Sequence, residues 1–289
     1  MTLTARCAQI ELHLNKLAPL VLTCLAAALA FGAGDARAAA RRQDGSFVSA
    51  AIAGRLHFEV YLPEGYETGT QRYPVLYVLH GLPSTASAYT SLGFVERALD
   101  SMGRAAIIVV PQGARGGESD PEYVDHGPGD RWETAIATEL PRVIDARFRT
   151  LRSRTGRALL GISAGGYGAM QLALHHLDEF SVVESWSGYF HPTDPTGTKA
   201  LDLGADADVH RLLRAVRSKL RAAKTFIAFY VGRGDRRFYA ENELLNQELS
   251  EAGVPHVFRA YPGGHDQALW QRYAAPWIEL ALVHLAAAH

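Results

Sequence analysis

Short apolar runs alternate with amphipathic stretches along the chain from residue 47 onward. The run LHFEVYLP at 56–63 alternates apolar and polar positions, as a half-exposed strand does. The runs at 73–81 and 105–113 are almost continuously apolar, which is typical of strands buried on both faces. Between them, apolar residues recur at helical spacing from Phe94 to Met102. This half of the chain is therefore predicted to alternate strands with helices.

The second half continues the alternation. Pro141 lies inside one predicted helix and should kink or restart it. Strands separated by helices imply an α/β fold, a mostly parallel sheet with helices on both faces, and the first strands form an antiparallel edge hairpin. The remaining predicted strands cover residues 157–163, 181–188, 225–235 and 256–265, and the remaining helices cover 132–148, 164–177, 238–252 and 268–287.

One segment departs from this pattern. Residues 190–224 are rich in Pro, Asp, Gly and Thr before they enter a basic amphipathic stretch. Open α/β sheets bind their ligands outside the carboxyl ends of the strands. The segment is therefore predicted to be an insertion over that end of the sheet, within a single domain that covers residues 39–289.

The first 38 residues are predicted to be a signal peptide. The apolar run from Leu17 to Phe31 has 15 residues, fewer than the roughly 18 expected of a membrane-spanning helix. The small residues of 36–38, or alternatively 38–40, form a cleavage site. The protein is thus expected to be secreted or held in the periplasm or cell envelope, with membrane contact only if the signal stays uncleaved as an anchor.

Composition limits the chemistry further. The two cysteines, Cys7 and Cys24, lie in the predicted signal, so the mature chain has neither disulfides nor a catalytic thiol. The net charge of −1 provides no basic field for nucleic acid. His175 and His176 are adjacent, which points them to different helix faces, and the chain has no H-E-x-x-H motif. No metal or other cofactor is expected.

The candidate nucleophile is Ser163, in the G-x-S-x-G motif at 161–165 between a predicted strand and a predicted helix. In a nucleophile elbow the glycines admit a tight turn that exposes the hydroxyl, and the N–H of Ala164 faces the developing oxyanion. The alternative is a glycine-rich junction that merely packs tightly. The motif alone does not choose between these interpretations.

Two later residues are candidates for the base and the acid. In α/β folds with a G-x-S-x-G elbow, the serine comes first in the chain, the acid second and the histidine last. His265 lies in a glycine loop between the last strand and the last helix, where it can reach over the serine. Asp235 follows a strand and precedes His265, with Glu241 one helical turn further on as the reserve. The alternatives are a surface or capping role for His265 and a helix N-cap role for Asp235.

The second oxyanion donor is expected in the loop after an early strand, LYVLHGLPS. Gly81 lets the backbone turn there, so the N–H of Leu82 would face the oxyanion together with that of Ala164. His80 is expected to brace this loop rather than to react.

These blocks together resemble the esterase family of the α/β-hydrolases, which includes esterase D, bacterial feruloyl esterases and secreted mycobacterial mycolyltransferases. The resemblance covers about residues 50–285 and rests on YPVLYVLHGL, RWETAIATELPRVIDARF, GISAGGYGAM, GRGD and PGGHDQALW. It implies Ser163 as nucleophile, Asp235 as acid, His265 as base, and Leu82 and Ala164 as oxyanion donors. The family often has methionine where this chain has Ala164.

The sequence therefore predicts an exported serine esterase that acts on a small ester of a sugar, lipid or aromatic acid through an acyl-enzyme. Two alternatives stay open: an acyltransferase of the mycolyltransferase type that uses a sugar or lipid alcohol, and a hydrolase-like protein that only binds. Four aromatic residues are candidates either for the acyl pocket or for the core, namely Tyr89, Trp186, Phe190 and Trp270.

Overall fold

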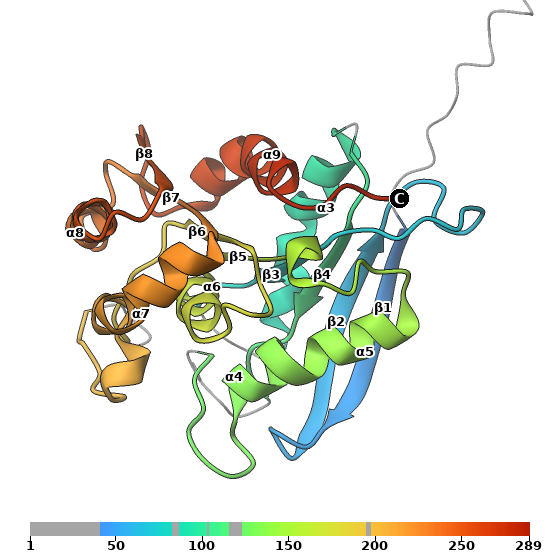
Figure 1. Ribbon diagram of the computed structural model, residues 1–289, viewed down its shortest axis with the longest axis horizontal. Helices are drawn as coiled ribbons and strands as arrows, with labels where there is room; N and C mark the ends of the chain where they lie inside the picture. The colour runs from blue at the N-terminus through green and yellow to red at the C-terminus, as the bar shows by residue number, and fades with distance from the viewer. Residues whose placement is uncertain (1–40, 83–86, 103, 116–122, 195–197) are drawn as a thin grey trace, which may run out of the picture. The chain divides into compact units, whose positions relative to one another are not determined.

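The computed structural model describes residues 41–82, 87–102, 104–115, 123–194 and 198–289 (Figure 1). The chain divides between Ala38 and Ala39, and the description concerns the second unit, Ala39–His289. The predicted signal at 1–38 lies outside the described residues. Within the described ranges, no helix has both the length and the hydropathy that a membrane crossing requires.

In the described part of the chain, eight strands form one sheet in the order β1-β2-β4-β3-β5-β6-β7-β8. The strands from β3 to β8 pair in parallel, whereas β2 pairs antiparallel with both β1 and β4. This arrangement confirms the mostly parallel sheet. The antiparallel edge hairpin consists of β1 and β2 and not of the first two predicted strands, because β4 lies between β2 and β3. The strands are β1 (Arg41–Ser49), β2 (Gly54–Leu62), β3 (Val75–Leu79), β4 (Ile107–Pro111), β5 (Arg157–Ile162), β6 (Val182–Trp186), β7 (Phe226–Gly232) and β8 (His256–Tyr261).

Helices cover both faces of the sheet, and successive side chains of each central strand enter opposite cores. In β3, Val75, Tyr77 and Leu79 join one core, while Leu76 and Val78 join the other. The second core is completed by α3 (Gly93–Asp100) and α9 (Gln267–Val283), which contact each other (Figure 1). The first is covered by α4 (Trp132–Thr134), α5 (Leu140–Arg147), α6 (Ala164–His175), α7 (Val209–Ala223) and α8 (Tyr239–Glu251).

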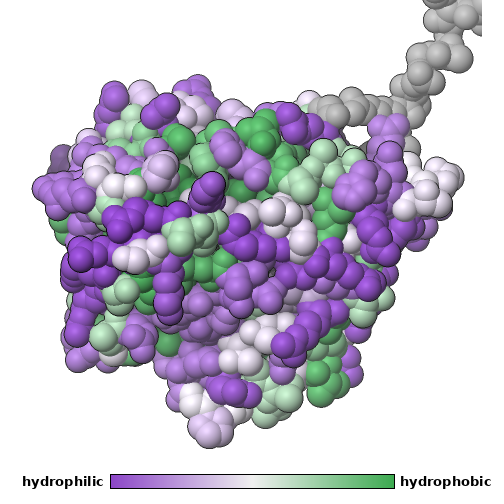
Figure 2. Space-filling model, in the orientation of Figure 1, coloured by the Kyte–Doolittle hydropathy of each residue, from purple (hydrophilic) through white to green (hydrophobic). Residues whose placement is uncertain are grey.

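Burial on both faces explains the apolar composition of the central strands. All five residues of β3 and all five of β4 are buried. On the face shown in Figure 2, hydrophilic side chains predominate and hydrophobic ones form smaller patches between them. Among the described residues, the large hydrophobic side chains that stay exposed are Val48, Leu244 and Val283.

The structure adds one strand that the hydrophobic pattern did not predict. Strand β1 begins at Arg41, six residues before the expected start of ordered elements, and pairs with β2 along its whole length. It lies at the edge of the sheet, and its first five residues are exposed or half-buried. An edge strand of this kind lacks the apolar alternation by which strands are found.

The predicted helix at 132–148 is restarted, as Pro141 suggested. Helix α4 leads into a π-helical turn, Ala135–Glu139, and α5 follows with Pro141 in its first turn. Proline has no N–H to donate to the carbonyl four residues earlier, and its ring crowds that carbonyl. The wider turn just before Pro141 accommodates both effects.

The segment 190–224, which was predicted to be an insertion, is described except for residues 195–197. It contains α7, which connects β6 to β7 and packs against α6, so this part is an ordinary crossover of the α/β fold. Its described residues contribute nothing to the lining of the cavity at Ser163. The basic side chains of α7 are explained by exposure: Arg211, Arg214 and Arg221 lie on its outer surface, while Leu212, Leu213 and Leu220 are buried.

Candidate active site

Ser163 occupies a strained turn between β5 and α6. Its backbone has φ 56° and ψ −119°, a conformation that residues with side chains rarely adopt. A Cβ added at Gly161 would lie 1.9 Å from the carbonyl oxygen of Gly165, and one added at Gly165 would lie 2.1 Å from that of Leu79. Glycine is therefore required at both motif positions for the turn to close.

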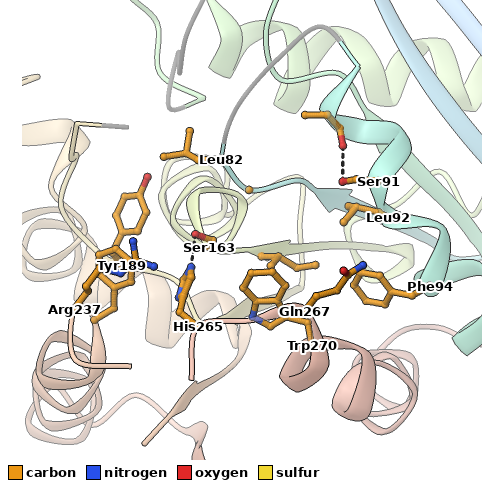
Figure 3. A pocket seen from close by; sticks show the side chains of 14 residues that line it. Leu82, Ser91, Leu92, Phe94, Ser163, Tyr189, Arg237, His265, Gln267 and Trp270 are labelled. Atoms are coloured by element: carbon orange, nitrogen blue, oxygen red, sulfur yellow. Dashed lines mark hydrogen bonds between the residues drawn. The ribbon is translucent and has the colours of Figure 1, made fainter. Parts of the chain in front are cut away.

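The structure brings Ser163, His265 and Asp235 into one hydrogen-bonded chain. Figure 3 shows the bond between Ser163 and His265. The Ser163 Oγ lies 2.8 Å from Nε2 of His265, and His265 Nδ1 lies 2.7 Å from Oδ2 of Asp235. The serine follows β5, and the other two residues lie in the loops after β7 and β8. Because parallel strands end at the same edge of the sheet, residues 102 and 30 positions apart in the sequence meet there.

The surroundings of Asp235 favour its charged form. The side chain is almost fully buried, and this burial by itself raises its pKa. The hydrogen bond and charge of His265 act the other way, as do the N–H groups of Arg237 and Phe238 at 3.2 and 3.4 Å from Oδ1. The net effect lowers the pKa of Asp235, so a carboxylate accepts the Nδ1 proton of His265.

Glu241, the reserve acid, is engaged elsewhere. Its carboxylate accepts a hydrogen bond from the N–H of Phe190 at 2.7 Å and pairs with Nδ1 of His191 at 2.5 Å. Burial raises its pKa, but bonds from His191 and His210 outweigh burial and lower it. Glu241 therefore fixes the loop after β6 onto α8, while Asp235 contacts the imidazole of His265.

The two expected oxyanion donors come from the Ser163 turn itself and from the loop after β3, which approaches that turn. Ala164 is the first residue of α6, where backbone N–H groups have no partner within the helix. Leu82 and Gly81 line the same cavity as Ser163. A Cβ at Gly81 would lie 2.9 Å from the carbonyl oxygen of Ile162, so glycine lets this loop approach the Ser163 turn.

His80 braces that loop from inside the protein. Its ring is buried, and burial lowers its pKa to about 4. The neutral ring donates from Nδ1 to the carbonyl oxygen of Gly81 at 3.0 Å, and Tyr123 Oη donates to the carbonyl oxygen of His80 at 2.8 Å. These bonds hold the backbone that carries Leu82.

A cavity of about 610 Å³ opens at Ser163. Of the four aromatic candidates for the pocket, Trp270 lines it, Trp186 and Phe190 are buried in the two cores, and Tyr89 packs against a core. The lining is completed by residues that the motifs did not indicate. These are Ala88, Ser91, Leu92, Phe94, Ile162, Tyr189, Arg237, Phe238 and Gln267.

The adjacent histidines at the end of α6 converge on one carboxylate. His175 Nδ1 and His176 Nε2 lie 2.9 and 3.0 Å from Oε1 of Glu133, and Gln171 donates to its Oε2 at 2.9 Å. His176 follows the last helical residue, so its ring turns back toward the same side. Burial raises the pKa of Glu133, but these bonds lower it to about 2. Glu133 thus connects α4 to α6, the helix that follows the Ser163 turn.

In the described ranges, no group of three or more His, Cys, Asp or Glu side chains is arranged to hold a metal ion.

Comparison with known proteins places this chain in a family. The family model named Esterase, described as "Putative esterase", matches residues 49–274. Esterase Rv1288 of Mycobacterium tuberculosis is 29% identical over 254 residues, which cover 76% of this chain and 54% of that protein. The chain thus spans about half the length of this curated relative. Over 73 residues, 25% of this chain and 22% of the relative, it is 34% identical to the diacylglycerol acyltransferase/mycolyltransferase Ag85A of Mycobacterium leprae.

The fold is also found among solved structures. A ferulic acid esterase superposes with a TM-score of 0.74 at 24% sequence identity, covering 86% of this chain and 98% of the other. The sheet described above is therefore the α/β-hydrolase fold that the sequence predicted.

Proposed function

This chain belongs to the esterase family, and on that premise we propose that it is an exported serine esterase that cleaves a carboxylic ester through an acyl-enzyme on Ser163. The family match and the relatives named as esterases support ester hydrolysis. The export part of the proposal rests on the sequence of residues 1–38, and N-terminal sequencing of the mature protein tests it.

The observation that carries the mechanism is the chain of hydrogen bonds from Ser163 through His265 to Asp235. As Ser163 Oγ attacks the ester carbonyl, His265 Nε2 takes its proton, and Asp235 holds the imidazole and stabilises its charged form. The N–H groups of Leu82 and Ala164 bind the oxyanion. His265 then protonates the leaving alcohol, and water attacks the acyl-enzyme to release the acid.

Replacing Ser163 with alanine tests this proposal. We expect kcat for an aryl ester to fall by at least about 10⁴-fold, because nothing replaces the nucleophile. Ser218→Ala is the matched control, since Ser218 is exposed on α7 and has no part in the proposed mechanism. The proposal fails if Ser163→Ala keeps the turnover of the control variant.

A second candidate function is acyl transfer, which the partial likeness to a mycolyltransferase favours. The same acyl-enzyme would then be resolved by a sugar or lipid alcohol instead of water. Turnover of an aryl ester with added trehalose or diacylglycerol distinguishes the two, with the acyl product identified by mass. Hydrolysis that is indifferent to both acceptors would exclude transfer to these alcohols.

A further inference from the structure

The cavity extends to both sides of the Ser163–His265 pair (Figure 3). In this view Tyr189 and Arg237 lie on one side, and Leu82 lies above Ser163. Residues Ser91, Leu92, Phe94, Gln267 and Trp270 line the other side. Among the described residues that line it, Arg237 alone carries a permanent charge, and none is acidic. The side of the cavity next to Tyr189 therefore contains a guanidinium group.

Arg237 is held in place by the site itself. Its N–H donates to Asp235 Oδ1 at 3.2 Å, so the carboxylate that contacts His265 also fixes the Arg237 backbone. Its Cζ lies 5.0 Å from the centre of the Phe238 ring, and that ring lies 5.3 Å from the His265 ring. The guanidinium thus rests on an aromatic wall that borders the reacting groups.

Helix stability does not explain a cation here. Arg237 directly precedes Phe238, the N-cap of α8, and a positive charge before the first turn opposes the helix dipole. Arg236, its neighbour, is also exposed but does not line the cavity. The position of Arg237 in the cavity lining therefore points to a role other than stabilising α8.

We propose that Arg237 determines substrate specificity by binding a carboxylate of the substrate. This inference rests on the proposed esterase function. The planar guanidinium matches a carboxylate in a bidentate arrangement, and its aromatic support strengthens the pairing. The preferred substrate is thus an ester that carries a second, free carboxylate on the portion next to Tyr189 and Arg237, with an uncharged portion on the side of Phe94 and Trp270.

Two matched pairs of esters test the proposal, because the carboxylate can belong to the alcohol or to the acid. The first pair is 4-acetoxybenzoate and 4-acetoxybenzamide, and the second is mono-4-nitrophenyl adipate and 4-nitrophenyl hexanoate. In at least one pair, the ratio of kcat/KM for the charged ester over the neutral one should fall by about tenfold or more in Arg237→Gln. Arg236→Gln should keep the wild-type ratio. Ratios within twofold of wild type in both pairs for Arg237→Gln would overturn the proposal.

A binding measurement separates this proposal from the esterase function. Calorimetry with Ser163→Ala should show weaker binding of 4-acetoxybenzoate or adipate monoester, again by about tenfold or more, once Arg237→Gln is added. Equal affinity of the single and double variants for both esters would overturn the role of Arg237. If the wild type turns over none of the four esters but this loss of affinity is seen, the esterase proposal fails while the carboxylate site stands.

Discussion

Three environments set the chemistry of single residues in this protein. A strained backbone places the Ser163 hydroxyl at the end of β5, and a buried, charged Asp235 orients His265 beneath it. His80 shows the opposite effect, since burial keeps its ring neutral and turns it into a structural brace. The two histidines thus have different environments, because His265 contacts a carboxylate and His80 contacts a backbone carbonyl.

Because the ring of His80 is buried, the free energy of unfolding should fall in weakly acidic solution. Its pKa is about 4 in the folded protein and about 6.5 in an unfolded chain, so the unfolded state binds the proton first. The neutral His80 ring contributes about 3 kcal/mol to the free energy of unfolding above pH 6.5. This contribution is lost as the pH falls from 6.5 to 4. The free energy of unfolding, measured with urea at pH 7.5, 5.5 and 4, should therefore decrease less with falling pH for His80→Asn than for wild type.

The control for this measurement is His57→Asn, because His57 is exposed on β2. It should keep the pH dependence of the wild type. Parallel stability curves for wild type and His80→Asn would contradict the buried, neutral state of His80.

At the scale of elements, the site is built by loops that follow β3, β5, β7 and β8 at one edge of the sheet. Each strand is held by its neighbours, so the loops carry the functional groups on a rigid base. The junction between β5 and α6 is the most constrained of them. It admits no side chain at Gly161 or Gly165, because backbone atoms occupy the space.

Gly161→Ala should therefore destabilise the fold by about 3 kcal/mol or more, since its Cβ would overlap the Gly165 carbonyl and the strand cannot move alone. Ester turnover should fall as the serine turn opens. Gly93→Ala is the control: its Cβ would meet only the end of the Arg97 side chain, at 4.0 Å. Denaturation midpoints that are equal for the two variants would show that the junction is less rigid than the structure indicates.

At the scale of the whole molecule, the sequence predicted what depends on local pattern. Buried strands, helical spacing and the order Ser163, Asp235, His265 sufficed for the sheet and for the three residues that the structure brings together. It missed β1, whose edge position removes the apolar signal. It also missed Tyr189 and Arg237, because only the packing of distant loops makes a residue line a cavity. For residues 190–224, composition alone did not distinguish an insertion from a crossover helix, since an exposed crossover helix is also basic and polar on its outer surface.

The central claim is that the folded molecule activates Ser163 as a nucleophile. Incubation with a fluorophosphonate, followed by peptide mass mapping, tests it most directly. The account predicts one adduct on the peptide that contains Ser163 in folded protein, and none in Ser163→Ala or in urea-unfolded wild type. Folded wild-type protein that leaves Ser163 unlabelled would contradict the account and favour a hydrolase-like protein that only binds.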